Sequence, residues 1–97
     1  MPMKRCRLTN IDTPAHFYDE LARQLELPAH FGRNLDALWD ALTGDVEGPL
    51  EIVWEDCETA SAKLGADYAK LAGLLKEVAA ERTDLTLEFL PAAKHSR

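Results

Sequence analysis

The sequence has few of the features that mark secreted, membrane-spanning or metal-binding proteins. Its 97 residues include only two cysteines and three histidines, and no apolar run approaches the roughly 18 residues of a membrane-spanning helix. The first ten residues, MPMKRCRLTN, are basic, but no apolar segment follows them, so a signal peptide is not supported. Without an export signal, Cys6 and Cys57 are expected to be reduced thiols in a cytoplasmic protein.

The histidines lack the spacing of a metal site. His16, His30 and His95 are scattered along the chain, and none of them forms the i, i+4 pair that would suggest zinc. The segment DVEG at residues 45–48 superficially suggests calcium. However, an EF-hand loop takes its glycine at the sixth position and a glutamate at the twelfth, and Gly48 comes too early. We therefore expect no metal ion and no cofactor.

Positive charge is missing from the middle of the chain. The net charge of −6 argues against a nucleic-acid partner, because phosphate would be repelled. No lysine or arginine lies between Arg33 and Lys63, and this stretch contains eight acids: Asp36, Asp40, Asp45, Glu47, Glu51, Glu55, Asp56 and Glu58. Such a negative field attracts a basic partner or a cation. Solubility is the commoner explanation of an acidic surface, so charge alone leaves both interpretations open.

Apolar residues that recur every three or four positions indicate three helices. The expected helices cover residues 14–25, 34–44 and 66–81, and a short helical turn is expected at 56–64. Thr13 and Asn34 are residue types that favour helix N-caps. Gly44 is well placed to end the second helix.

Three short segments have the apolar character of strands, at residues 6–9, 50–54 and 85–90. Strands separated by helices favour parallel pairing with right-handed crossovers. Ninety-seven residues are too few for two independent cores. We therefore expect an α/β fold, with a three-stranded parallel sheet packed with helices in a single domain over residues 1–90. The tail at residues 91–97 is expected to be flexible.

The residues give little support to catalysis. Cys57 lies between Asp56 and Glu58, whose charges oppose the thiolate that a nucleophile needs. Asp36 and Asp40 lie one helical turn apart and could serve as paired carboxylates, but nothing nearby supplies a positioned acid, base or groove. Like charges at this spacing cost a helix roughly 0.2–0.5 kcal/mol, so their presence calls for a reason other than helix stability.

A protein-binding surface explains these residues better. Trp39 adjoins the apolar stripe of the second helix, which is typical of a core residue. It also precedes Asp40 at the margin of that stripe, and aromatic groups beside charged ones are typical of interface hot spots. His30 lies in the preceding loop, either as a solvated residue or as a contact residue. Glu77 and Glu81 form a second acidic i, i+4 pair, which a solvated helix face also explains.

Residues 25–54 resemble the barstar family of ribonuclease inhibitors. The matching elements are Leu27-Pro28, Phe31-Gly32, NLDALWD at residues 34–40, LTG at 42–44 and the proline-led strand at 49–54. The resemblance extends more loosely from about residue 3 to residue 90. It implies the three-layer α/β fold of that family, with a three-stranded parallel sheet. The function it implies is inhibition of a barnase-like ribonuclease by blocking the active site.

The resemblance also implies how such an inhibitor binds. The second helix and the preceding loop would enter the substrate cleft of the enzyme, with Asp40 in the place of an RNA phosphate and Asp36 beside it. The expected contact residues are His30, Phe31, Gly32, Asn34, Asp36, Trp39, Asp40, Thr43, Gly44, Asp45, Glu47 and Glu77; Glu81 matches a further acidic position. The expected partner is a basic ribonuclease, barnase-like or a nuclease toxin, bound one-to-one by an inhibitor that is monomeric when free. No role is expected for nucleic acid or a membrane.

Two positions depart from the family pattern. His30 and Asp45 stand where the best-known member of the family has aromatic residues, so the target can differ from barnase itself. An alternative is a regulatory or scaffolding protein of the same fold that binds a basic partner other than a nuclease. A third possibility is an enzyme or metal binder that uses the acidic residues.

Overall fold

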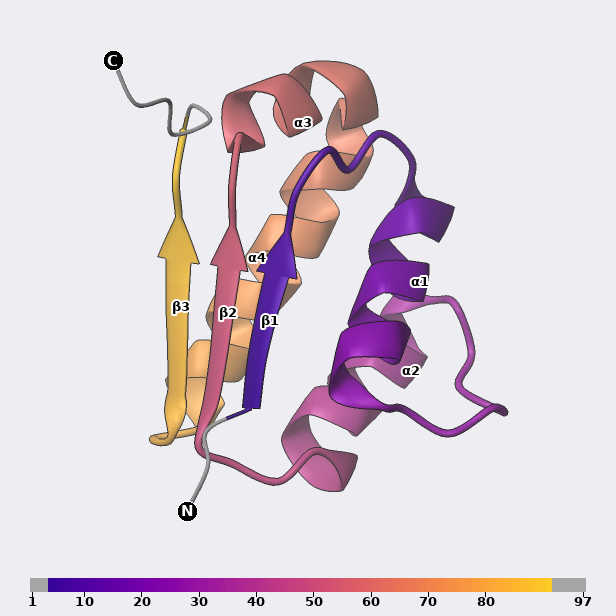
Figure 1. Ribbon diagram of the computed structural model, residues 1–97, viewed down its shortest axis with the longest axis vertical. Coiled ribbons are helices and arrows are strands. Elements are labelled where there is room, and N and C mark those ends of the chain that lie inside the picture. The colour runs from indigo at the N-terminus through magenta and orange to yellow at the C-terminus, as the bar shows by residue number, and fades with distance from the viewer. Residues whose placement is uncertain (1–3, 92–97) are drawn as a thin grey trace.

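The computed structural model describes residues 4–91, and the chain order of its elements agrees with the order expected from the sequence (Figure 1). The elements are β1 (Lys4–Leu8), α1 (Pro14–Leu25), α2 (Leu35–Asp40), the π-helical η1 (Ala41–Asp45), β2 (Leu50–Trp54), α3 (Cys57–Leu64), α4 (Ala66–Glu81) and β3 (Leu85–Phe89). His95 and nearly all of the expected tail, residues 92–97, lie outside the described residues.

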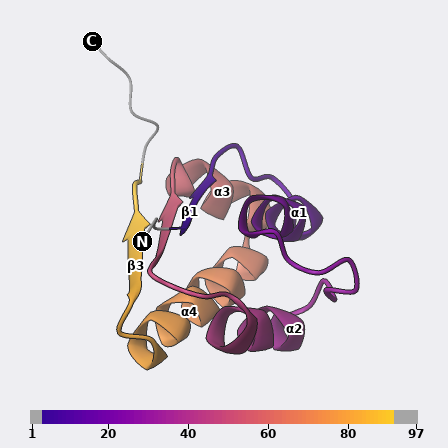
Figure 2. The ribbon, with the colours of Figure 1, turned by 60° about the horizontal axis from the view of Figure 1, so that its bottom comes forward.

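The three strands form one parallel sheet in the order β1-β2-β3. Cys6 is opposite Ile52, which in turn is opposite Leu87. Because side chains alternate across a strand, these three residues share one face of the sheet. The helices lie together on one side of the sheet (Figure 2). The prediction of a three-stranded parallel sheet packed with helices is confirmed.

The core lies between the sheet and the helices and includes an aromatic cluster around Trp54. Trp54 is fully buried, and its ring centroid lies 5.1 Å from that of Phe17 and 5.0 Å from that of Tyr68. The apolar stripe predicted for the first helix, including Leu21 and Leu25, is buried in this core. The helix begins where it was expected, because the Thr13 side chain accepts a hydrogen bond from a backbone N–H of the first turn.

Several boundaries differ from the expectations. β1 begins at Lys4 rather than Cys6, because the charged side chains of Arg5 and Arg7 are exposed and do not interrupt pairing with β2. The short helical element expected at 56–64 is an α-helix over residues 57–64, one residue shorter than expected. The second helix does not end at Gly44 but continues as a π-helix, in which the N–H of Val46 donates to the carbonyl of Ala41 at 2.9 Å. Such wide turns hydrogen-bond i to i+5 and occur frequently at functional sites.

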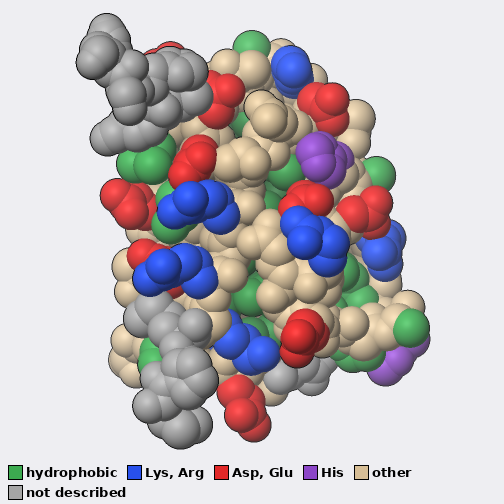
Figure 3. Space-filling model, viewed as in Figure 1, with side chains coloured by type: hydrophobic (Ala, Val, Ile, Leu, Met, Phe, Trp, Pro, Cys, Tyr) green, Lys and Arg blue, Asp and Glu red, His purple; other side chains and the backbone are tan. Residues whose placement is uncertain are grey.

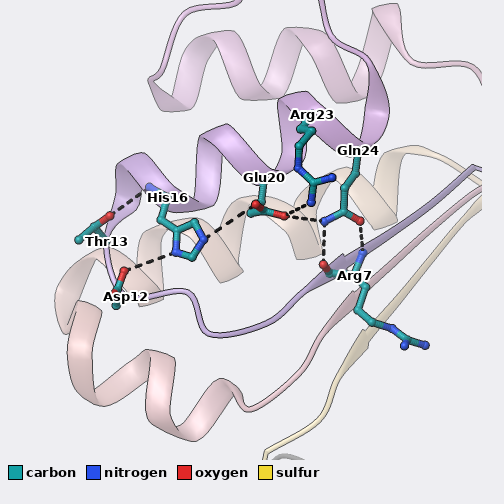
Figure 4. A network of polar contacts seen from close by, with 7 residues as sticks. All are labelled: Arg7, Asp12, Thr13, His16, Glu20, Arg23 and Gln24. Carbon is teal, nitrogen blue, oxygen red and sulfur yellow. Dashed lines mark hydrogen bonds and ion pairs between the residues drawn. The ribbon is translucent and has the colours of Figure 1, made fainter.

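Helix α1 covers the outer edge of β1 through Gln24. The Gln24 side chain donates from Nε2 to the carbonyl of Arg7 and accepts at Oε1 from the N–H of Arg7, each at 2.8 Å (Figure 4). These bonds satisfy backbone groups that an edge strand would otherwise leave open to another chain. Glu20 also accepts hydrogen bonds from Arg23 at 2.6 Å and from Gln24 at 3.0 Å. These two bonds, that of Arg23 first, lower the pKa of the Glu20 carboxyl.

Both cysteines lie in the core as free thiols. Burial, with a smaller contribution from the charge of Glu20, raises the pKa of the Cys6 thiol to about 12. Cys57 is 8 % exposed at the start of α3. Within residues 4–91, no helix has the length and apolar character needed to cross a membrane.

Candidate protein-binding site

Helix α2 presents its acidic face to solvent because its apolar face is anchored in the core and its N-terminus is capped. Asn34 has an extended backbone, and its Oδ1 accepts a hydrogen bond from the N–H of Ala37 at 2.8 Å. Leu38 is fully buried and anchors the opposite face, while α2 packs against α4. Asn34, expected as a contact residue, thus also acts as the N-cap of this helix. Asp36 and Asp40 lie on the exposed side.

Asp36 and Asp40 carry negative charges that the described part of the chain does not neutralise. Both residues are exposed, and neither lies within 4.0 Å of a basic group in residues 4–91. Asp36 is in the first turn of α2, where the helix dipole favours a carboxylate. Asp40 is the last residue of α2 and lacks that advantage. The two carboxylates are therefore available to a positive partner.

The expectation that all eight central acids lack a counter-charge is wrong for two of them. Glu51 pairs with Arg5 at 2.6 Å, and Glu55 pairs with Arg7 at 3.2 Å. The parallel register places Arg5 opposite Glu51, although no lysine or arginine lies near Glu51 in the sequence. Basic and acidic side chains lie next to each other on the sheet side of the molecule (Figure 3). Among the other acids of this stretch, Asp36 and Asp40 on α2, together with Glu47, Asp56 and Glu58, have no basic partner within residues 4–91.

The loop before α2 is anchored by Phe31 and exposes His30. Phe31 is 8 % exposed, and its ring centroid lies 6.3 Å from that of Tyr18. The Arg33 guanidinium lies over the Phe31 ring, with its Cζ 5.8 Å from the ring centroid, and its Nη1 donates to the Phe31 carbonyl at 3.0 Å. Phe31 thus packs mainly into the core, whereas His30 is exposed at the surface.

The loop and helix α2 meet at a small hollow. Its volume is about 170 Å³, and it is lined by Pro28, His30, Phe31, Gly32, Ala37, Asp40 and Ala41. Packing is tight at Gly32, where a Cβ would lie 3.0 Å from Nδ2 of Asn34 and 3.3 Å from Cβ of Ala37, so a side chain here would have to displace these neighbours slightly. The structure therefore brings His30 and Asp40, ten positions apart in the sequence, to the same hollow.

Trp39 is half-buried against the edge of the core. Part of its side chain therefore packs in the core, as one interpretation expected, and part remains accessible, as a contact residue requires. Its carbonyl accepts a hydrogen bond from Oγ1 of Thr43 at 2.7 Å. Thr43, Gly44 and Glu47 are exposed on η1 and the segment that follows it. The backbone of Asp45 belongs to η1, but its side chain lies outside what the structure describes.

Glu77 is exposed on α4 and faces α2 across a groove. The groove has a volume of about 350 Å³ and is lined by Leu35, Ala69, Lys70, Gly73, Leu74 and Glu77. A larger hollow of about 410 Å³ brings Asp36 together with Asp67 and Lys70 from the first turns of α4. Sequence reasoning missed Asp67 and Lys70, because no local pattern places the start of α4 beside the start of α2.

The exposed side of α2 is suited to binding cationic groups. Within the part of the chain that the structure describes, no three or more histidine, cysteine or acidic residues are grouped to coordinate a metal. Asp36 and Asp40 project from one rigid helix, with Trp39 and His30 at their margins. Such a surface accepts hydrogen bonds from cationic groups such as guanidinium.

Comparisons with known proteins agree with this description. Residues 1–91 match the family model described as Barstar (barnase inhibitor). A curated relative from Bacillus subtilis (strain 168), named "Putative ribonuclease inhibitor YrdF", is 39% identical over 67 residues, which cover 69% of this chain and 74% of that protein. The three-stranded parallel sheet with its helices is consistent with this match. The chain therefore belongs to the barstar family.

Proposed function

We propose that this protein inhibits a basic ribonuclease by occupying its active site, with Asp36 and Asp40 in the positions of RNA phosphates. The observation that carries the proposal is the pair of exposed carboxylates one turn apart on α2, neither of which is neutralised within residues 4–91. Membership of a family described as barnase inhibitors supports the same function.

Electrostatics explains why such a pair is useful to an inhibitor. A ribonuclease cleft must be positively charged to hold phosphate, so carboxylates placed in it accept charge-assisted hydrogen bonds from arginine. The repulsion between Asp36 and Asp40, roughly 0.2–0.5 kcal/mol in the free helix, is relieved when cations approach. Long-range attraction also accelerates the encounter of an acidic inhibitor with a basic enzyme.

The proposed contact surface extends beyond this pair. It includes His30, which is exposed in the loop before α2, and Trp39, which is half-buried at the edge of the core. It also includes the exposed residues of η1 and Glu77 of α4. The inhibitor has no catalytic part in this mechanism, binds one-to-one as a monomer, and acts in the cytoplasm. Because His30 and Asp45 depart from the family pattern, the target is a basic ribonuclease or nuclease toxin that can differ from barnase.

Titration of ribonuclease activity tests the proposal. Barnase and a panel of other basic ribonucleases are titrated with wild-type protein and with the Asp40→Asn variant. We expect one-to-one inhibition by the wild type. Truncating one partner of a buried charge pair costs about 2–5 kcal/mol, so Asp40→Asn should weaken inhibition about 30-fold or more.

Asp19→Asn provides the matched control. Asp19 is also an exposed aspartate on a helix, but it pairs with Arg33 at 3.0 Å and lies outside the proposed contact. This variant should inhibit like the wild type. Inhibition by Asp40→Asn that equals the wild type would exclude the phosphate-mimic mechanism. Binding of a basic protein that has no nuclease activity, with no ribonuclease inhibited, would support the scaffolding alternative instead.

A further inference from the structure

Arg82 connects the end of α4 to the segment that follows α2. It is the first residue after α4, and its side chain is 11% exposed. Its Nη1 donates to the carbonyls of Leu42 and Val46, at 2.8 and 2.9 Å. Its Nε and Nη2 donate to the two carboxylate oxygens of Asp84, at 2.9 and 3.0 Å. The planar guanidinium thus uses three nitrogens at once, a geometry that lysine cannot reproduce.

The two backbone carbonyls that Arg82 binds lie on either side of residues 43–45. The last carbonyls of a helix have no partner within the helix, and a π-helical turn alters the usual pairing further. Arg82 supplies the missing donor at both Leu42 and Val46. Thr43 and Gly44, which lie between them, are exposed and belong to the proposed contact surface.

The packing around this link leaves no space for a side chain at Gly48. A Cβ at Gly48 would overlap the Asp84 carboxylate and lie 2.7 Å from Nη2 of Arg82. The Arg82–Asp84 pair is therefore pressed against the backbone of the segment that leads from η1 to β2. In addition, the N–H of Leu50 donates to the carbonyl of Asp84 at 2.9 Å.

We propose that Arg82 is a positioning residue for partner binding, which fixes residues 43–47 relative to α4. In this role it holds Thr43, Gly44 and Glu47 in a constant orientation to Glu77 of α4. A segment that is ordered before binding loses less conformational entropy when the complex forms. The binding part of this proposal rests on the proposed function, whereas the fixing of residues 43–47 is a property of the free protein.

Hydrogen exchange on the free protein tests the positioning role without any ribonuclease. In the Arg82→Lys variant, which keeps the charge, the amide of Val46 should exchange at least tenfold faster, because its bond to Ala41 is no longer held in place. The amides of Leu38 and Glu55, which donate to Asn34 and Leu8, should exchange at wild-type rates. Arg23→Lys is the control, since Arg23 is exposed and pairs only with Glu20 among the described acids.

Two outcomes of this measurement would overturn the proposal. Unchanged exchange at Val46 would show that residues 43–47 are ordered without Arg82. An equal increase at Val46, Leu38 and Glu55 would show that Arg82 supports global stability only. Arg82→Met, which removes the charge but keeps much of the aliphatic stem, provides a second variant in which the same local pattern is expected.

Binding kinetics provide the second readout, with a ribonuclease that the wild type inhibits. Arg82→Lys should raise the dissociation rate about tenfold. The association rate and its dependence on salt should not change, because the net charge is the same. Faster exchange at Val46 with an unchanged dissociation rate would exclude residues 43–47 from the contact. Failure of the proposed function itself is recognised separately, by wild-type protein that inhibits no ribonuclease.

Discussion

Replacing Asp40 with asparagine should stabilise the free protein, although we expect it to weaken inhibition. Asp40 is exposed, has no basic partner within residues 4–91, and follows Asp36 by one turn. Removing this like-charge repulsion should raise the free energy of unfolding by roughly 0.2–0.5 kcal/mol. The helix continues past Asp40 as η1, so this carboxylate lies away from both helix ends and the helix dipole adds little to the gain. Because asparagine and aspartate have similar helix propensities, the expected gain is at most about 0.5 kcal/mol.

Equilibrium unfolding in urea at low ionic strength measures this gain as a shift of the midpoint without a change of slope. For a chain of this length, about 0.5 kcal/mol corresponds to a rise of roughly 2–4 °C in Tm. In 1 M salt the screening length falls to about 3 Å, so most of the gain should disappear. Asp19→Asn is the matched control. It removes an aspartate that is paired with Arg33, so stability should stay the same or fall by up to about 1 kcal/mol.

Two results would refute this reasoning. A loss of stability in Asp40→Asn would show that the carboxylate makes a favourable contact within the folded chain. A gain of the same size in low and high salt would show that the effect does not come from charge repulsion. In either case the exposed carboxylates of α2 would not be an unneutralised pair, and the physical basis of the phosphate-mimic proposal would be lost.

Three further predictions concern the core and the titrating groups. Leu38→Ala should lower the free energy of unfolding by about 2–5 kcal/mol, because Leu38 is fully buried; a loss below 1 kcal/mol in urea unfolding would show that α2 is not anchored there. The Cys6 thiol stays protonated in the native state up to about pH 12, whereas the unfolded chain ionises from about pH 9.0. Stability should therefore fall above pH 9, with a slope that approaches about 1.4 kcal/mol per pH unit, and Cys6→Ala should flatten this decline between pH 9 and 10. Arg82 lowers the pKa of the Asp84 carboxyl below 3.8. The ion pair therefore stabilises the fold above that pH, and this stabilisation is lost as the pH falls through the lowered pKa. Asp84→Asn should reduce the acid dependence of stability measured between pH 5 and 2.

Much of this protein follows from interactions between residues close together in the sequence. Thr13 and Asn34 begin α1 and α2 because their side chains cap the backbone three residues later. The apolar period of α2 turns Leu38 toward the core and leaves Asp36 and Asp40 on the opposite side. Both carboxylates of the candidate site could therefore be placed on one exposed helix face from the sequence.

Which charges are neutralised, and where the second helix ends, depend on contacts between distant parts of the chain. Arg5 neutralises Glu51 from 46 positions away, because two strands pair in a parallel register. Arg82 reaches back 40 positions to the carbonyl of Leu42 and 36 to that of Val46, at the turn where the helix continues beyond Gly44. Hydrogen bonds and charge pairs depend on distance in space, and the sequence gives that distance only for near neighbours. Local patterns were therefore enough to predict the helices and their exposed faces, whereas the contacts between elements could be identified only in the folded chain.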